Sequence, residues 1–218
     1  MTSQSHLGGE GSTTFAGGSN QYLEFDPGDI ATDAIMISCW IRGTNLSAFD
    51  GIVWNRAETG GNQVGLFLGN PATEIGIKIG GGVAYSAAGI ITQSQWHHVL
   101  GVWRHDTNLV EAYVDGVMRA SATPTSSSVD IDAGPWMIGN DSATSNRAWQ
   151  GQIEDVLICA GPREAFNGLD APQFHRELLQ GRSRSHFNYR RLIFAPAGEA
   201  AAPAAADFPF RRYYSGMV

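Results

Sequence analysis

Long apolar runs are missing from this 218-residue sequence. No stretch approaches the roughly eighteen consecutive apolar residues that a membrane-spanning helix needs. The first residues, 1–6, have neither the positive charge nor the apolar segment of a signal peptide. We therefore expect a soluble protein that is made in the cytoplasm and is not exported by that route.

Cysteine is scarce, with only Cys39 and Cys159 in the chain. Both lie inside strand-like runs, where a reduced cysteine packs as a small apolar side chain. A disulfide requires an oxidising compartment and suitable Cβ geometry, and a chain made in the cytoplasm supplies neither. We expect two buried free thiols.

The sequence also lacks long stretches with a heptad repeat or the 3.6-residue period of a helix. It combines 27 glycines with 43% hydrophobic residues, which suits many short strands joined by tight turns. Its length allows one β-sandwich with an appendage, because all-β domains often exceed the usual domain size. The predicted fold class is therefore all-β.

Three motifs of catalytic and metal sites are absent, namely His-Glu-x-x-His, Cys-x-x-Cys and Gly-x-Ser-x-Gly. These motifs mark zinc metalloproteases, zinc sites and the nucleophile elbow of hydrolases. Without them, the sequence gives no support to any of these classes.

The clearest strand pattern lies in the middle of the chain. Two apolar-rich runs, Trp96–Trp103 and Leu109–Val114, are separated by the polar residues 104–108, as in two antiparallel strands joined by a turn. Asp115-Gly116 follows, a dipeptide that accepts the positive φ angles of a tight primed turn. The pattern predicts a three-stranded meander that ends near Ser121.

A period of two within these runs separates a buried face from an exposed one. In the second run Val110, Ala112 and Val114 share one face. Residues 35–41 and 75–79 alternate in the same way, with isoleucine at most positions of one face. Each segment is therefore predicted to be a strand with one side against a core.

The segment Gln95-Trp96-His97-His98-Val99, followed by Tyr113-Val114-Asp115-Gly116, resembles the central signature of laminin-G-like, concanavalin-A-like lectin/glucanase jelly rolls. The resemblance covers about residues 14–180 and implies a two-sheet antiparallel jelly-roll sandwich. Other segments resemble further strands of that family: Phe15 to Leu23 the opening strand, Ile37 to Ile41 a core strand, and Trp136 to Gly139 and Gly151 to Val156 the closing strands.

Three parts of the chain are predicted. Residues 1–13 are polar and Gly-rich, and form a flexible N-terminal arm. Residues 14–180 form the sandwich, which ends in a short helix over 171–180 that Asp170 can cap. Residues 181–218 are rich in Ala, Pro, Arg and aromatic residues, and form an extended C-terminal arm.

Charge divides the chain in a similar place. Residues 1–174 hold 7 Lys plus Arg and 18 Asp plus Glu, a net charge of −11, whereas residues 175–218 hold 7 and 3, a net charge of +4. An acidic body argues against direct nucleic-acid binding by the sandwich, and a basic tail argues for a negatively charged contact.

We expect no catalytic residues and no enzyme activity. His97 and His98 are neighbours on a strand and point to opposite faces, so they cannot share a metal ion. The glucanases of the family that this chain resembles carry a Glu-x-Asp-x-x-Glu pattern on one strand, which is absent here. Glu111 and Asp115 come nearest to it, but the turn needs Asp115.

Two loop pairs, Asn140-Asp141 and Glu154-Asp155, could offer oxygen ligands to calcium. Asp and Asn in loops are more often turn formers, so we expect no metal and no other cofactor. A sugar site needs an exposed aromatic platform with polar neighbours. Trp54, Trp103 or Trp149 could provide one, although tryptophans in a sandwich mostly fill its core.

The C-terminal arm would expose apolar surface in a free monomer. Arginine and aromatic residues are enriched in interface cores, so we expect the arm to contact neighbouring subunits. A solvated, disordered tail has a similar Ala/Pro composition and is the alternative. The expected contact residues are Arg182, Arg184, Phe187, Tyr189, Arg190, Arg191, Phe208, Phe210, Arg211, Arg212, Tyr213 and Tyr214.

A laminin-G-like sandwich with such a tail also resembles structural proteins of tailed bacteriophages. We therefore predict a non-enzymatic virion protein, a capsid decoration, cement or head–tail accessory protein. Its sandwich would project outward while the C-terminal arm clamps to the major capsid protein or to neighbouring copies of the chain in a homo-oligomer. The alternative function is a carbohydrate-binding adhesion module that contacts host-surface glycans. Neither function involves a membrane.

Overall fold

The computed structural model describes residues 13–18, 21–25, 30–32, 34–55, 63–79, 81–125, 129–131, 136–141, 147–161, 165–166 and 168–174. The regular secondary structure of these residues consists of β-strands and one short helical turn at 171–174, so the all-β prediction is confirmed. The helical turn is too short to cross a bilayer, and no other described segment forms a membrane-spanning helix. The strands are β1 (Thr13–Ala16), β2 (Leu23–Phe25), β3 (Ile30–Thr32), β4 (Ala34–Gly43), β5 (Gly51–Asn55), β6 (Gly65–Leu68), β7 (Ile75–Ile79), β8 (Gly82–Tyr85), β9 (His97–Arg104), β10 (Leu109–Val114), β11 (Val117–Ala122), β12 (Val129–Ile131), β13 (Trp136–Ile138) and β14 (Gln150–Gly161).

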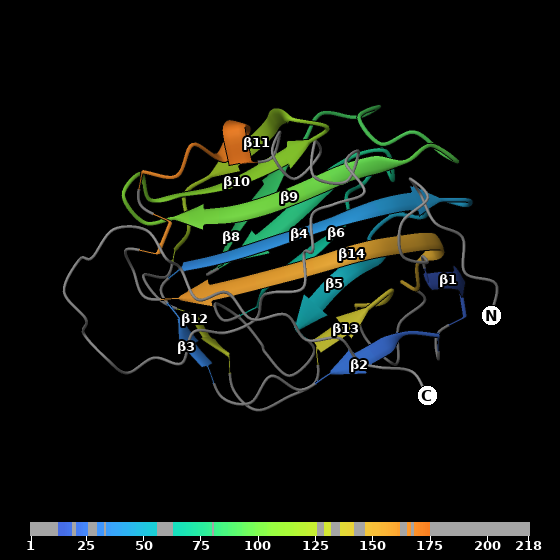
Figure 1. Ribbon diagram of the computed structural model, residues 1–218. Helices are drawn as coiled ribbons and strands as arrows, with labels where there is room; N and C mark the ends of the chain where they lie inside the picture. The colour runs from blue at the N-terminus through green and yellow to red at the C-terminus, as the bar shows by residue number, and fades with distance from the viewer. Residues whose placement is uncertain are drawn as a thin grey trace, which may run out of the picture.

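Two six-stranded sheets pack face to face (Figure 1). The first sheet has the order β1-β14-β4-β9-β10-β11, and the second has the order β2-β13-β5-β6-β7-β8. Neighbouring strands of both sheets are antiparallel, and β3 pairs with β12 in a small separate ribbon. This arrangement is the predicted two-sheet jelly-roll sandwich.

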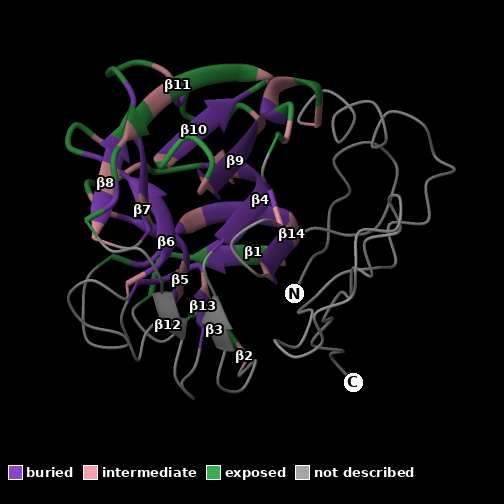
Figure 2. Cartoon of the chain, turned by 90° about the vertical axis from the view of Figure 1, so that its left-hand side faces the viewer, coloured by how far each residue is buried: buried purple, intermediate pink, exposed green. Residues whose placement is uncertain are grey.

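The interior between the sheets is filled by the alternating apolar side chains. Ile35, Ile37 and Ile41 of β4 and Ile75 and Ile77 of β7 are wholly buried there. Burying each of these side chains contributes about 1.5–3 kcal/mol. Figure 2 shows the buried strands of the two layers facing each other. Three tryptophans also lie in this interior: Trp103, Trp136 and Trp149.

The predicted meander is confirmed as β9, β10 and β11, with the first strand beginning at His97 instead of Trp96. Asp115 and Gly116 have φ angles of 50° and 83°, as the primed turn requires. Asp115 Oδ1 also accepts a hydrogen bond of 2.8 Å from the backbone N–H of His98. The turn therefore uses both the backbone and the side chain of this aspartate.

The prediction of one opening strand from Phe15 to Leu23 is wrong. The structure has two short strands there, β1 in the first sheet and β2 in the second. Gly17 has a φ of 83°, and the carbonyl of Gly18 accepts a 2.8 Å hydrogen bond from Gln21 N–H. A turn at this position carries the chain from one layer to the other.

The segment 165–174 packs on the outer face of the first sheet. Phe166 and Ala171 join a second apolar cluster with Met36, Leu100 and Tyr113, which point away from the sandwich interior. Burial also raises the pKa of the Cys159 thiol, which belongs to this cluster. Cys39 faces the interior, and both cysteines are free and buried as expected.

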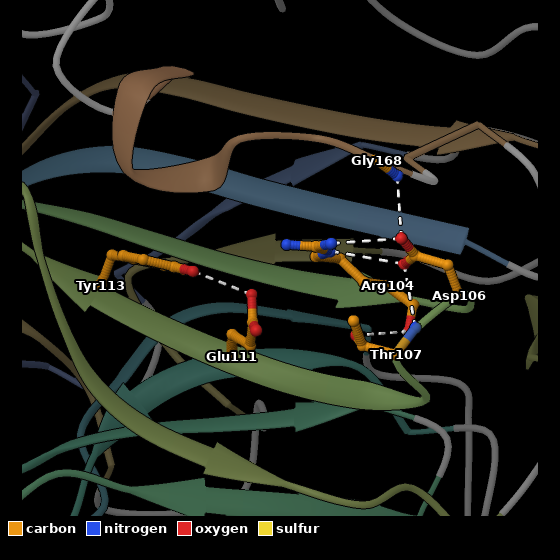
Figure 3. A network of polar contacts seen from close by, with 6 residues as sticks. All are labelled: Arg104, Asp106, Thr107, Glu111, Tyr113 and Gly168. Carbon is orange, nitrogen blue, oxygen red and sulfur yellow. Dashed lines mark hydrogen bonds and ion pairs between the residues drawn. The ribbon is translucent and has the colours of Figure 1, made fainter.

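Asp106 fastens this segment to the sheet (Figure 3). Its Oδ2 accepts hydrogen bonds from Gly168 N–H at 2.8 Å and from Arg104 Nη2 at 3.1 Å. Asp170 then caps the helical turn, because its Oδ1 accepts a 2.9 Å hydrogen bond from Gln173 N–H. The predicted cap is confirmed, whereas residues 175–180 of the predicted helix lie outside the described residues.

Both predicted arms, 1–13 and 181–218, lie outside the described residues except for Thr13. The same holds for every contact residue expected in the C-terminal arm, from Arg182 to Tyr214. Their docking on other subunits stays a prediction.

Candidate functional site

Three aromatic side chains follow one another across the outer face of the second sheet. The strand register places Trp54 of β5 beside Gly65 of β6, Phe67 of β6 beside Gly76 of β7, and Gly76 beside Tyr85 of β8. Because successive side chains of a strand alternate between faces, these residues point outward while their neighbours fill the interior. We call Trp54, Phe67 and Tyr85 the aromatic row.

Glycines on the neighbouring strands let the rings lie close to the sheet. A Cβ atom at Gly65 would lie 1.8 Å from Cε3 of Trp54, and one at Gly76 would lie 2.8 Å from the ring of Phe67. Either contact is shorter than two carbon atoms allow. The alternation of glycine with large aromatic residues therefore fixes where the rings sit.

The rings of the aromatic row support one another. Trp54 and Phe67 have ring centroids 5.4 Å apart at 81°, and Phe67 and Tyr85 are 5.8 Å apart at 88°. These are edge-to-face contacts, which stabilise aromatic pairs beyond the area they bury. Phe67 is 6% exposed and Tyr85 is 46% exposed, while Trp54 is half-buried. The central ring thus holds two more accessible rings in place.

Polar side chains flank the aromatic row. Lys78 of β7 is paired in register with Gly65 and Val83, and its Nζ donates a hydrogen bond to Oε1 of Gln63. The side chains of Glu74 and Tyr85 both pass close to Gly69. A face of this kind can pack apolar C–H surface of a ligand on the rings and hydrogen-bond its hydroxyl groups at the edge.

Of the three candidate platform tryptophans, Trp54, Trp103 and Trp149, the structure places only Trp54 on an outer face. Trp103 and Trp149 are wholly buried in the interior, so these two fill the core, as expected from the sequence for most tryptophans in a sandwich, and they do not offer a platform. The sequence reasoning missed Phe67 and Tyr85. The available signal was the outward set on β6 and β7, where Gly65, Phe67 and Gly76 alternate with buried aliphatic residues.

His97 and His98 point to opposite faces, as predicted. His97 Nδ1 lies 2.7 Å from Oδ2 of Asp115, at the turn between β10 and β11. His98 is buried on the outer face of the first sheet, with Nε2 2.9 Å from Ser38 Oγ and its ring edge-on to Trp40. The two imidazoles have separate partners and do not form one ligand set.

The hydrogen-bonded pair of Ser38 and His98 was not found from the sequence. A serine beside a histidine is the arrangement that activates a nucleophile in acyl-transfer enzymes. Both residues are 2% exposed, so a substrate does not reach the serine hydroxyl in this conformation. The pair instead satisfies two buried polar groups on a mostly apolar sheet face.

The two carboxylates that came nearest to a glucanase pattern serve structural contacts. Glu111 Oε2 accepts a 2.8 Å hydrogen bond from the hydroxyl of Tyr113 (Figure 3). Burial, followed by the nearby Glu111 carboxylate, raises the pKa of Tyr113. Asp115 accepts from the backbone of His98. Neither arrangement places two carboxylates across one reacting bond.

The loop pair Asn140-Asp141 lies near another acidic residue, Asp50. Asp141 Oδ2 is 2.8 Å from Arg147 Nη1, and Asn140 Oδ1 accepts a hydrogen bond from the N–H of Asp141. Burial raises the pKa of Asp50 to about 6, with a further increase from the negative charge of Asp141. Arg147 thus supplies the positive charge that this loop pair contacts.

The second pair, Glu154-Asp155, lies within strand β14 and not in a loop as expected. The register of β14 shifts against β4 at this point, and Asp155 has a φ of 49°. Among the described residues, no group of three or more His, Cys, Asp or Glu side chains is arranged to hold a metal ion. The absence of a cofactor stays a prediction.

Comparison with protein families matches residues 17–165 to the concanavalin A-like lectin/glucanases superfamily. Comparison with curated proteins gave no match. Among solved structures, a heptameric SAP-like pentraxin from Limulus polyphemus is similar, with 19% identity over 66% of this chain and 73% of that chain and a TM-score of 0.51.

Two other similar structures are longer than the matched region. Domains LG4-5 of the mouse laminin alpha1 chain have 17% identity over 67% of this chain and 40% of that chain, with a TM-score of 0.53. A proposed carbohydrate-binding protein from Bacteroides ovatus has 15% identity over 71% and 45%, with a TM-score of 0.55. At these identities the similarity establishes the fold.

Proposed function

Because this chain belongs to the concanavalin A-like lectin/glucanases superfamily and carries the aromatic row, we propose that it is a non-enzymatic glycan-binding module. The observation that carries the proposal is the row of Trp54, Phe67 and Tyr85, set over glycines and flanked by Lys78. Rings of this kind pack against the C–H faces of sugars. The Bacteroides ovatus protein, by its description, supports the same function.

The proposed site and the segment 165–174 lie on different sheets of the sandwich. The segment 165–174 occupies part of the outer face of the first sheet, around Leu100 and Tyr113. The aromatic row lies on the opposite side of the sandwich, on the second sheet. Ligand binding there leaves the packing of the segment 165–174 undisturbed.

A glycan array with the full-length chain tests this function. We expect binding to at least one class of glycan with a dissociation constant of about 1 mM or tighter, because a shallow face with two accessible rings contributes only a few kcal/mol. Release of reducing ends from a β-glucan serves as the test for enzyme activity, and we expect none. A chain that binds no glycan on the array contradicts the proposal.

The composition of residues 175–218 favours a second role, the attachment of the chain to a larger assembly. Residues 175–218 carry a net charge of +4 against −11 for residues 1–174, with arginine and aromatic residues of the kind that anchor interfaces. In this proposal the module is displayed on a virion as a decoration or head–tail protein. Deleting residues 182–218 should abolish assembly onto the particle and leave glycan binding intact.

A further inference from the structure

Lys78 is the single lysine of the chain, and it lies on the same sheet face as the aromatic row. Its register partner on β6 is Gly65, the residue over which the Trp54 ring lies. Adjacent strands are about 4.8 Å apart, so the long side chain of Lys78 can reach the edge of that ring. The one lysine of an acidic body therefore stands at the Trp54 end of the row.

The ammonium group of Lys78 has a neutral partner. Its Nζ donates to the amide oxygen of Gln63, and among the described residues no carboxylate lies within ion-pair distance of it. An ammonium group has three N–H donors, and within the described part of the chain Gln63 takes one of those of Lys78. Lys78 is half-buried, and a charge pair in such a setting is stronger than one in open water.

We infer that the aromatic row binds glycans that carry an acidic sugar, with Lys78 contacting its carboxylate or sulfate group. This inference rests on the proposed glycan-binding function and names the class of ligand. A charge-assisted hydrogen bond from an ammonium to an anion is shorter and stronger than one to a neutral hydroxyl. The acidic sugar then lies at the Trp54 end of the row.

The charge around the site limits the ligand to one acidic group. Glu74 lies directly before β7, four residues before Lys78, and its side chain passes close to Gly69 together with that of Tyr85. A second anion at the Tyr85 end would meet this carboxylate. The net charge of −11 over residues 1–174 also repels polyanionic chains. Neutral sugars therefore occupy the Tyr85 end.

The experiment compares matched glycan pairs on an array that differ in one acidic group. Sialylated and desialylated, uronic-acid and neutral, and sulfated and unsulfated pairs are probed with the full-length chain, with Lys78→Gln and with Lys78→Arg. We expect the full-length chain to bind the acidic member of at least one pair about tenfold more tightly. Lys78→Gln should reduce that ratio to about one, with the larger loss of affinity in the acidic member of the pair, and Lys78→Arg should keep most of the ratio.

Salt and polyanions provide further readouts. The preference for the acidic member should shrink between about 50 and 500 mM salt because the charge pair is partly exposed. Heparin should bind no better than the singly charged glycans. Comparing the affinity ratio of the uronic-acid and sialylated pairs with that of the sulfated pairs shows whether a carboxylate or a sulfate is preferred.

Several results would overturn the inference. Equal binding of acidic and neutral members by the full-length chain, or a preference that persists in Lys78→Gln, removes Lys78 as the determinant while leaving the glycan-binding function in place. A preference for heparin over singly charged glycans contradicts the limit of one acidic group. Failure to bind any glycan removes the inference together with the function on which it rests.

Discussion

Asp50, at the residue scale, is a carboxyl group that folding removes from water. Its side chain is 1% exposed, and its Oδ2 accepts a 2.9 Å hydrogen bond from the N–H of Ser47. Its Oδ1 is buried without a hydrogen-bond partner among the described residues. Burial and the charge of Asp141 raise its pKa from 3.8 to about 6, so the folded state favours the protonated form.

The raised pKa of Asp50 predicts how stability changes with pH. The folded state holds this proton more tightly than the unfolded state, so the contribution of Asp50 is greatest below about pH 4 and is lost as pH rises to about 6. Asp50→Asn should remove this loss and be more stable than the natural chain at pH 7, by up to about 3 kcal/mol. Urea unfolding of both chains between pH 4 and 7 measures the difference. If the unfolding free energies of the two chains changed with pH in parallel, the raised pKa of Asp50 would be contradicted.

Trp54 shows why single residues of the site were hard to place from the sequence. In β5 the register shifts between Gly51 and Val53, so Ile52 and Val53 are both buried and the period of two is interrupted. The side on which Trp54 lies could not be inferred from its neighbours. Trp103 lies in the regular strand β9, where alternation with Val102 places it in the interior.

Asp106, at the element scale, holds the segment 165–174 on the β9–β10 hairpin. The hydrogen bond from Arg104, followed by that from the Gly168 N–H, lowers the pKa of Asp106. The contribution of this carboxylate to stability is present above the pKa it has in the unfolded chain. It is lost as pH falls through the lower pKa of the folded chain. This direction is opposite to that of Asp50.

Replacing Asp106 tests the attachment of this element. Asp106→Ala should cost about 1 kcal/mol of unfolding free energy at pH 7, because the Gly168 N–H and the Arg104 guanidinium lose their acceptor. Hydrogen exchange at the amide of Gly168 should accelerate, while exchange in β4 stays slow. Asp106→Asn keeps an acceptor without the charge and should have a smaller effect. Unchanged exchange at Gly168 in both variants would show that the hydrogen bonds of Asp106 do not hold the segment 165–174 on the sheet.

The elements themselves were largely predictable. The meander β9–β11 and the strands β4 and β7 have regular alternation and a strong turn signal at Asp115-Gly116, so they were found with small errors at their ends. The opening strand was predicted wrongly, because Gly17 and Gly18 form a turn inside a segment whose composition otherwise suits one strand. The positive φ of Gly17 therefore divides this segment into the two strands β1 and β2.

At the scale of the whole molecule, the sandwich has two unlike outer faces. The first sheet carries the apolar cluster under residues 165–174 and the buried pair of Ser38 and His98. The second sheet carries the aromatic row and Lys78. Together the row and Lys78 come from four strands, β5 to β8, whose adjacency depends on pairing across three hairpins. Sequence patterns give each strand, but not this register.

The affinity of aromatic-row variants for the best glycan from the array tests the central claim most directly. Isothermal titration would compare the natural chain with Trp54→Ala, Tyr85→Ala and the control Met118→Ala, whose side chain is 52% exposed on β11 of the first sheet. We predict that each aromatic-row variant loses about tenfold or more in affinity while staying folded, and that the control is unchanged. Full affinity in both aromatic-row variants would contradict a glycan site on the second sheet.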